Sequence, residues 1–230
     1  FAACRRGHLD IAQWLVGRFA YLNTSEALSG ACAGGSFEIV EWLVHEFHLD
    51  AGFHNNAFHL ACTYGHTRIA AWLADHVGIS NGAACRLDAE SFRDACVQGH
   101  LELVKWFGPR FRVDGAMVRC KDNWTFRNVC ITGHLLVAEW LVDFFQLTLN
   151  DVSADNHAAF RLACTAGHLA VGQWLANRFQ LTAQDARMLN NSMFKNVIRN
   201  GHTDTFEWLV ERYQLHEGEE AVELFRYACH

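Results

Sequence analysis

Residues 160–175, FRLACTAGHLAVGQWL, show the pattern on which the whole chain is built. The stretch contains Cys164 and His168, two potential metal ligands four residues apart, and the same spacing recurs elsewhere. The pairs are Cys4/His8, Cys62/His66, Cys96/His100, Cys130/His134 and Cys164/His168. Two explanations are open: an array of metal or redox sites, or a packing motif that recurs with the fold.

A glycine anchor defines a repeat that runs along the whole chain. Successive anchors are 28 and 30 residues apart at the start and 34 apart thereafter. A tryptophan stands seven residues after every anchor, and an aromatic residue stands twelve after six of the seven. From the second anchor onward, Leu or Phe stands seven residues before it. The anchors are Gly7, Gly35, Gly65, Gly99, Gly133, Gly167 and Gly201. This register predicts a fold made of structural repeats.

Each repeat is expected to form two antiparallel helices. A capping residue four positions before the Leu or Phe would begin the first helix, and the anchor glycine would end it in a left-handed conformation. The expected caps are Thr24, Asp88, Asp122, Asn156 and Asn190. The second helix carries apolar residues over roughly 220° of its surface, too wide an arc for packing on one side. Such a helix needs neighbours on both sides, which is typical of a solenoid.

The segments between repeats predict short helical connectors. LTLNDVS (147–153) and LTAQDAR (181–187) each place Asp three residues after Thr. This is the spacing of a capping box with a shorter acid. We therefore expect one helical turn followed by a polar loop.

The stretch AFRLACTAGHLAVGQWL resembles the ankyrin repeat, whose pattern is T-P-L-H-L-A-A-x-x-G-H-L-x-[IV]-x-x-L-L. The residues on that frame are Phe160, Arg161, Leu162, Ala163, Cys164, Gly167, His168, Leu169, Val171, Trp174 and Leu175. The resemblance implies an all-α, right-stacked solenoid of helix pairs. It covers the chain as one array, with a partial repeat 1–20, repeats 21–50, 51–80, 81–114, 115–148, 149–182 and 183–216, and a partial repeat 217–230.

The departures from the ankyrin pattern are systematic. Phe replaces the Leu that follows the family's Pro, the Pro is absent, Cys replaces the second Ala, and Trp replaces the first Leu of the pair. F-x-L-T replaces the G-A-D-V-N finger, so helical connectors are expected in place of β-hairpin fingers. The substituted pattern is similar to the ankyrin arrays of amoeba-infecting giant viruses and some protists. Both ends of the sequence fall within a repeat, so we expect flanking domains or protomers there.

Composition limits the classes of function. Hydrophobic residues make up 51% of the chain and the net charge is −6, so the basic footprint of a nucleic-acid or membrane-surface binder is missing. No apolar run approaches the ~20 residues of a transmembrane helix. Nine cysteines spread through a Trp- and Phe-rich chain favour a reducing, intracellular and cytoplasmic location. There is no Gly-rich phosphate loop, H-E-x-x-H motif or nucleophile elbow, so we expect no enzymatic activity and no cofactor.

The recurring Cys and His residues fit packing better than metal binding. A structural zinc site needs about four ligands, and one repeat supplies only a pair, separated by the glycine that ends a helix. We therefore predict no metal, with Cys acting as a small apolar residue and His bonding backbone groups at the turn. The repeat tryptophans could form a stacking platform for bases or sugars, but packing of each indole against the next repeat is favoured.

A row of basic residues is the main candidate for partner binding. It lies six residues before the anchors, on the first helix, which lines the concave surface of ankyrin arrays. Its members are His59, Arg93, Arg127, Arg161, Lys195 and Arg226. Since Arg grips carboxylates bidentately, the row predicts an acidic protein partner. The alternative is that each Arg bonds carbonyls or Asp side chains of a connector, such as Asp151 or Asp185.

Trp124 is the one tryptophan outside the register. It stands where other repeats have small or polar residues, and it is either a binding hot spot or a local plug of the loop. Together these features predict a protein–protein interaction module or adaptor that binds along its concave face. The alternative is a structural spacer or assembly component of a larger chain or particle.

Overall fold

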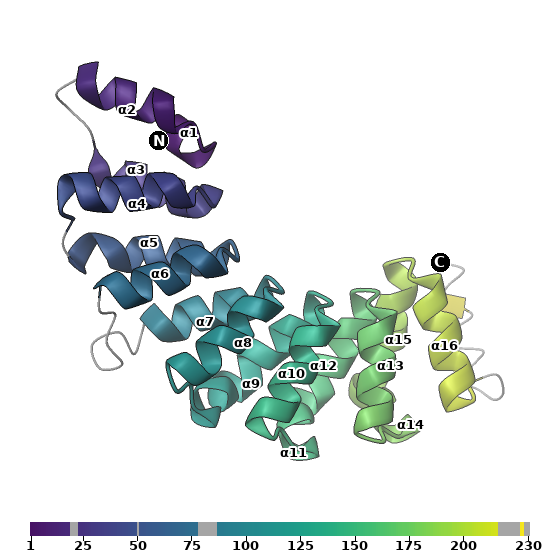
Figure 1. The fold of residues 1–230 in the computed structure, drawn as a ribbon. Coiled ribbons are helices and arrows are strands. Elements are labelled where there is room, and N and C mark those ends of the chain that lie inside the picture. Colours follow the sequence, from purple (N-terminus) through teal and green to yellow (C-terminus); the bar gives the residue numbers. More distant parts are fainter. Residues whose placement is uncertain (19–22, 50, 78–86, 216–225, 228–230) are drawn as a thin grey trace. The chain divides into compact units, whose positions relative to one another are not determined.

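The computed structural model describes residues 1–18, 23–49, 51–77, 87–215 and 226–227. Within these ranges every regular element is a helix, as Figure 1 shows, and the predicted all-α fold is confirmed. The chain divides into two compact units, Phe1–Val113 and Asp114–His230. None of the helices in the described ranges is both long and apolar enough to pass through a bilayer. That all 230 residues form one array stays a prediction.

Unit 1 contains four helix pairs, each joined by a turn at an anchor glycine. The first helices pack on one another in order, α1 on α3, α3 on α5 and α5 on α7. The second helices α4, α6 and α8 form the other layer. The pairs are α1 (Ala2–Arg5) with α2 (Leu9–Arg18), α3 (Thr24–Gly34) with α4 (Phe37–Phe47), α5 (Ala51–Thr63) with α6 (Thr67–Val77), and α7 (Leu87–Val97) with α8 (Leu101–Arg110).

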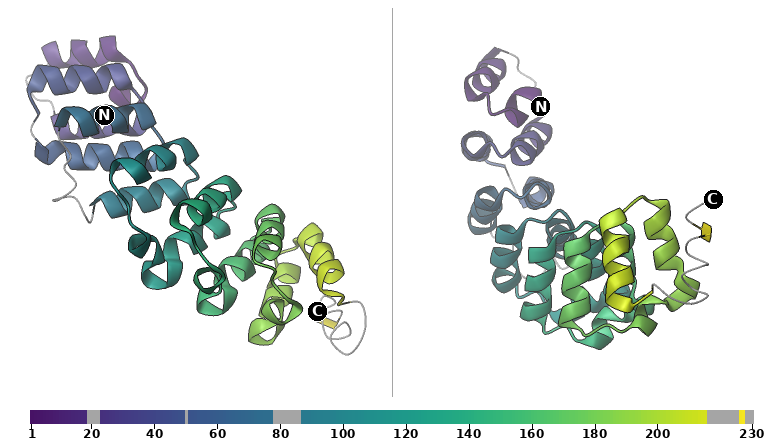
Figure 2. Two further views of the ribbon diagram at one scale, coloured as in Figure 1. Left: turned by 60° about the horizontal axis from the view of Figure 1, so that its bottom comes forward. Right: turned by 90° about the vertical axis from the view of Figure 1, so that its right-hand side faces the viewer.

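Unit 2 repeats this plan and adds two short helices. In Figure 2 the second helices α10, α13 and α16 follow one another along the stack, while α9, α12 and α15 contact in order. The bounds are α9 (Gly115–Ile131), α10 (Leu135–Phe145), α11 (Leu149–Val152), α12 (Ala154–Thr165), α13 (Leu169–Arg178), α14 (Ala183–Ala186), α15 (Met188–Arg199) and α16 (Thr203–Tyr213).

The anchor glycines adopt the predicted left-handed conformation. All seven have φ between 73° and 82°, a region that only glycine enters without steric cost. The chain reverses there, and the second helix begins two residues later. The prediction that these glycines end the first helices is confirmed.

The short helices α11 and α14 are the predicted connectors. In α11, the Asp151 carboxylate accepts a hydrogen bond from the Thr148 backbone N–H at 2.8 Å. In α14, Asp185 accepts from the Thr182 backbone N–H at 2.7 Å. Both form complete capping boxes, so each connector begins as one stable helical turn rather than a β-hairpin finger.

The predicted caps of the first helices are wrong at all five positions. Thr24 is the first residue of α3, and the Asn23 side chain caps that helix instead, accepting from the Glu26 N–H at 3.2 Å. Asp122 and Asn156 lie in left-handed turns, both with φ 55°. Asp88 and Asn190 already lie inside α7 and α15. The cause is chemical, because the short polar side chains that favour caps also tolerate the left-handed region.

The core follows the repeat register. Phe58, Phe92, Phe126, Phe160 and Phe194, seven residues before their anchors, are at most 2% exposed. The rings of Phe58 and Phe92 on the first helices meet Phe107 on α8, with centroids 5.8 and 5.6 Å apart. Fully burying such a side chain contributes about 1.5–3 kcal/mol. The aromatic register therefore supplies the main apolar contacts within each unit.

Candidate functional site

The repeated cysteines are part of the packed interior. Five of these cysteines are fully buried: Cys32, Cys62, Cys96, Cys130 and Cys164. Burial raises the pKa of Cys32 to about 12, and it also raises the pKa of Cys96, Cys130 and Cys164. Metal binding and redox chemistry use the thiolate, which burial disfavours. These side chains therefore act as small apolar residues.

The repeated histidines bond the backbone of the preceding repeat. His66 donates from Nε2 to the Ala33 carbonyl at 3.2 Å, and His100 donates from Nε2 to the Thr63 carbonyl at 2.9 Å. Each acceptor lies at the end of the first helix of the repeat before, so the bonds join adjacent repeats. The prediction that these histidines bond backbone groups near a turn is confirmed at these two positions. Among the described residues, no cluster of three or more His, Cys, Asp or Glu side chains could hold a metal.

Two of the repeat tryptophans, Trp72 and Trp208, contact aromatic residues of the preceding repeat. The Trp72 ring meets Phe37 edge-on with centroids 6.0 Å apart, and it meets His45 at 6.1 Å. The Trp208 ring meets Phe160 at 6.4 Å. Packing of these indoles between repeats agrees with the prediction, but the ring contacts are with the preceding repeat; packing on the next repeat stays a prediction.

In unit 1 the basic row already has partners within the protein. His59 Nδ1 lies 3.1 Å from the Ser91 hydroxyl, and its Nε2 lies 3.5 Å from the Asp94 carboxylate. Arg93 lies 3.9 Å from the Glu90 carboxylate, one turn earlier on α7. The side chains of both ion pairs are partly exposed, so these pairs are screened and weak.

In unit 2 two members of the row meet at one loop. Arg127 donates to the Asp155 carboxylate and, from Nη2, to the Lys121 carbonyl at 3.3 Å. Arg161 donates from Nε to the Asn156 carbonyl at 2.7 Å and from Nη2 to the Asp155 carbonyl at 3.3 Å. Partial burial lowers the pKa of Arg161, and the Asp155 charge opposes that effect. The structure thus brings Arg127 and Arg161 together at Asp155.

The remaining predicted site residues of unit 2 are Lys195, Arg226 and Trp124. Lys195 is half-buried on α15, and Arg226 is exposed in the short described segment 226–227. Trp124 is 38% exposed beside the left-handed turn within α9. Its carbonyl accepts a hydrogen bond from the Asn128 side-chain amide at 2.8 Å. A large, partly exposed ring beside Arg127 on the same helix is compatible with a role in binding.

The connector aspartates bond residues outside the basic row. Asp151 accepts from Arg119 Nε at 2.9 Å, and Asp185 lies 3.1 Å from His157 Nε2. Burial raises the pKa of both carboxyls, but hydrogen bonds from the connector threonines and the facing Arg119 or His157 outweigh it, so each pKa is lowered. The expectation that the row itself would bond Asp151 or Asp185 misidentified these partners.

A recurring polar position in the sequence marks the residues that contact Asp151 and Asp185. The position ten residues before the anchor is polar in three successive repeats and is held in a left-handed conformation each time. Asn123 donates from this position to the Asp151 carbonyl at 2.9 Å. His157 occupies this position in the next repeat, but its Nε2 contacts the side-chain carboxylate of Asp185 and not a carbonyl. The recurring polar residues at this position are Asn123, His157 and Asn191.

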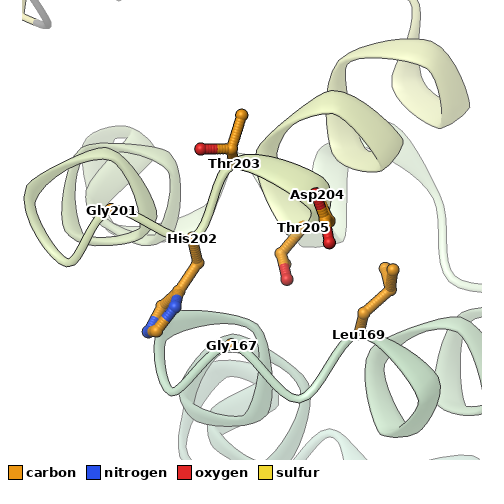
Figure 3. A pocket seen from close by; sticks show the side chains of 7 residues that line it. All are labelled: Gly167, Leu169, Gly201, His202, Thr203, Asp204 and Thr205. Carbon is orange, nitrogen blue, oxygen red and sulfur yellow. The ribbon is translucent and has the colours of Figure 1, made fainter.

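A small hollow of about 260 Å³ lies between the turns before α13 and α16, shown in Figure 3. The His202 ring lies over Gly167, and Thr205 and Asp204 line the adjoining wall. Thr205 is 2% exposed, whereas the other repeats have an aliphatic residue at its position. The hollow is smaller than the roughly 300–1,000 Å³ of sites that enclose small-molecule ligands.

Comparison with known proteins agrees with this geometry. A family model described as ankyrin repeats in three copies matches residues 1–85 and, overlapping, residues 28–114. No curated protein sequence matches the chain. The matched residues include the helix pairs of unit 1, whose turns and inter-repeat contacts are described above.

Proposed function

The chain belongs to the ankyrin-repeat family, whose members are generally protein–protein interaction modules, and from that premise we propose that it is an adaptor for a partner protein. The partner would bind along the concave face formed by the first helices. We further propose that the partner is acidic at its contact surface and that the adaptor works without cofactor, metal or catalytic activity.

The cluster of Arg127, Arg161 and Asp155 carries this proposal. Arg161 uses Nε and Nη2 for carbonyls of its own loop, and no described residue bonds its Nη1. The guanidinium is therefore held in place with a donor still available. A fixed guanidinium loses little freedom on binding a carboxylate, which favours recognition. A partner carboxylate could also replace Asp155 at Arg127.

We also propose that the chain forms one continuous array, that it is located in the cytoplasm and that its partner is not a nucleic acid. One continuous array with the boundaries given above would provide a long surface for the partner. A cytoplasmic, reducing location suits the buried free thiols of the described repeats. The net charge of −6 argues against nucleic acid as the partner. The proposed likeness to the ankyrin arrays of giant viruses and protists rests only on the positions where Phe, Cys and Trp replace the usual residues.

A structural spacer or assembly component is the second candidate. It is favoured by one observation: four members of the basic row, His59, Arg93, Arg127 and Arg161, already bond groups within the protein. Those residues would then stabilise the loops between repeats instead of binding a partner.

The two functions are separated by a charge reversal on the first helices. Proteins captured from the native source by the wild type are compared with those captured by Arg127→Glu/Arg161→Glu. The control is Arg178→Glu, on the outer helix α13, where Arg178 makes an exposed ion pair with Asp143 at 3.4 Å. An adaptor should lose a specific partner only in the double variant, with circular dichroism unchanged. Equal capture by all three proteins would favour the spacer.

A further inference from the structure

Helix α10 carries a stripe of apolar side chains on its outer surface. Leu136 is 62% exposed and Phe144 is 42% exposed. They stand eight residues apart, and Trp140 lies between them, four residues from each, so all three share one side of the helix. Trp140 has contacts within the protein: its ring stacks on Phe144 with centroids 4.6 Å apart and meets Phe145 edge-on at 5.8 Å. Leu136 and Phe144 are therefore the exposed members of the stripe.

The positions of Leu136 and Phe144 face solvent in every repeat. They stand three and eleven residues after the anchor glycine, and both are exposed in all seven helices that follow such a glycine. In the other six helices the first position carries Asp, Glu or Arg five times and Ala once. The second position carries Arg, Glu or His in all six. The exposure thus belongs to the repeat register, whereas large apolar side chains at both positions belong to α10 alone among these seven helices.

Acidic side chains run along one edge of the stripe. Asp143 faces α13, where Arg178 lies 3.4 Å from its carboxylate. Glu139 stands one turn earlier on the same side of α10, and it forms no ion pair with any residue in the ranges that the structure describes. The sequence of α10, LLVAEWLVDFF, contains no Lys or Arg. The surface therefore combines exposed apolar side chains with negative charge that α10 itself does not neutralise.

These charges decide between the possible occupants of the stripe. A second copy of α10 would offer no cation to Glu139 or Asp143 and would bring like charges together. An anionic membrane surface would be repelled for the same reason. A helix with apolar side chains every three or four residues and Lys or Arg beside them satisfies both features of the surface. Its cations are also attracted to exposed aromatic rings such as Phe144.

We propose that α10 is a docking surface for a basic amphipathic helix of a partner protein. The apolar side of that helix lies along Leu136, Trp140 and Phe144. Its Lys or Arg side chains bond Glu139 and, in exchange for Arg178, Asp143. The surface lies in the layer of second helices (Figure 1), whereas the basic row lies on the first helices. It is opposite in charge to the basic row and does not rest on the function proposed above.

The size of the stripe predicts weak binding. From Leu136 to Phe144 the helix rises by about 12 Å, two turns and a little more. Such a surface is smaller than the roughly 800 Å² per partner of a standard interface. The dissociation constant should therefore lie between about 10 and 500 µM.

Fluorescence anisotropy of a labelled synthetic peptide tests the proposal. The peptide is a helix of about four turns with Leu at intervals of three and four residues and Lys elsewhere, and a comparison peptide has Glu in place of Lys. The full chain is added up to about 1 mM. The Lys peptide should bind, and the Glu peptide should bind at least about tenfold more weakly. Leu136→Ser/Phe144→Ser, which changes no charge, should weaken binding of the Lys peptide at least about tenfold, and Glu139→Lys should weaken it too.

The matched control is Asp204→Ser/Arg212→Ser, at the same two register positions of α16 and likewise without a change in net charge. It should bind the Lys peptide as the wild type does, and circular dichroism should show that every variant is folded. Chemical shifts of backbone amides should change most in α10 when the Lys peptide is added.

Three results would overturn the proposal. The first is no binding of the Lys peptide, or equal binding by the wild type and Leu136→Ser/Phe144→Ser. The second is equal binding of the Lys and Glu peptides, which would refute the basic chemistry of the partner. The third is self-association of the wild type in sedimentation velocity that Leu136→Ser/Phe144→Ser removes, which would assign the stripe to a second copy.

Discussion

At the scale of single residues, a turn glycine and the turn histidine of the next repeat act together at four junctions of the described repeats, those at Gly35, Gly65, Gly133 and Gly167. The glycine reverses the chain with a positive φ, and its lack of a side chain leaves room for the next histidine. At Gly167 a Cβ would lie 2.5 Å from Nδ1 of His202. The sequence predicted the conformation of the glycine correctly, because the register placed it at a helix end. The histidine's place over the preceding glycine depends on repeat spacing, which no single repeat reveals.

Gly167→Ala should therefore destabilise the protein by about 2–4 kcal/mol, from the cost of a side chain at positive φ plus displacement of His202. Gly17→Ala is the control, because it lies in α2 with open space around it. It should be neutral or stabilise by up to about 1 kcal/mol through helix propensity. Urea denaturation at low protein concentration measures both. Equal effects of the two substitutions would contradict the role given to Gly167.

At the scale of elements, the sequence predicted the helical connectors. It did not predict the left-handed turns that precede the first helices of unit 2. Thr182 and Asp185 are close in sequence, so the capping box of α14 follows from local spacing. The turns at Asp122 and Asn156 are left-handed, and an Asp or Asn at such a position is equally suited to a cap. The bonds from Arg127 and Arg161 depend on where the turn places Asp155. The sequence therefore predicted the basic row but not which of its members meet.

The α14 capping box predicts a dependence of stability on pH. The pKa of Asp185 is lowered in the folded protein, despite burial, by Thr182 and His157. A lowered folded pKa means that the ionised group stabilises the fold above its unfolded pKa of about 3.9, and that this contribution is lost as the pH falls through the folded value.

Asp185→Asn should thus cost about 1 kcal/mol in the free energy of unfolding at neutral pH, and the difference from wild type should shrink below about pH 4. Urea denaturation from about pH 7 to pH 3 measures this. Asp122→Asn is the control, since Asp122 is exposed and its carboxylate bonds no described residue. A difference between Asp185→Asn and wild type that is constant down to pH 3 would show that Asp185 has no lowered pKa.

At the scale of the molecule, stability should be distributed among neighbouring repeats. In unit 2, α12 contacts α9 and α15, which flank it in the stack. In such an array the free energy of folding is approximately a sum of repeat terms and contacts between neighbours. The sequence predicted this architecture because the aromatic register repeats, and each Phe identifies its own place in the core.

Phe160→Ala should cost about 3–5 kcal/mol, since the ring is fully buried in α12. Hydrogen exchange followed by mass spectrometry should show the largest increases in α12 and in its neighbours α9, α13 and α15. Helices α3 and α5 should change least, and Leu28→Ala in α3 should give the reverse pattern. A uniform increase over all helices would show that the chain unfolds as a single cooperative body.

The hydrogen bonds from His66 and His100 to carbonyls of the preceding repeat give these two junctions the same chemistry and the same direction. One side of a repeat supplies the donor and the other supplies the acceptor and the bare glycine. A whole repeat can therefore be duplicated or lost in evolution without creating a mismatched seam. Single substitutions at a junction are less well tolerated, because a new side chain on the glycine requires a simultaneous change in the neighbouring repeat. Among related arrays, the number of repeats should therefore vary more readily than the residues at the junctions between repeats.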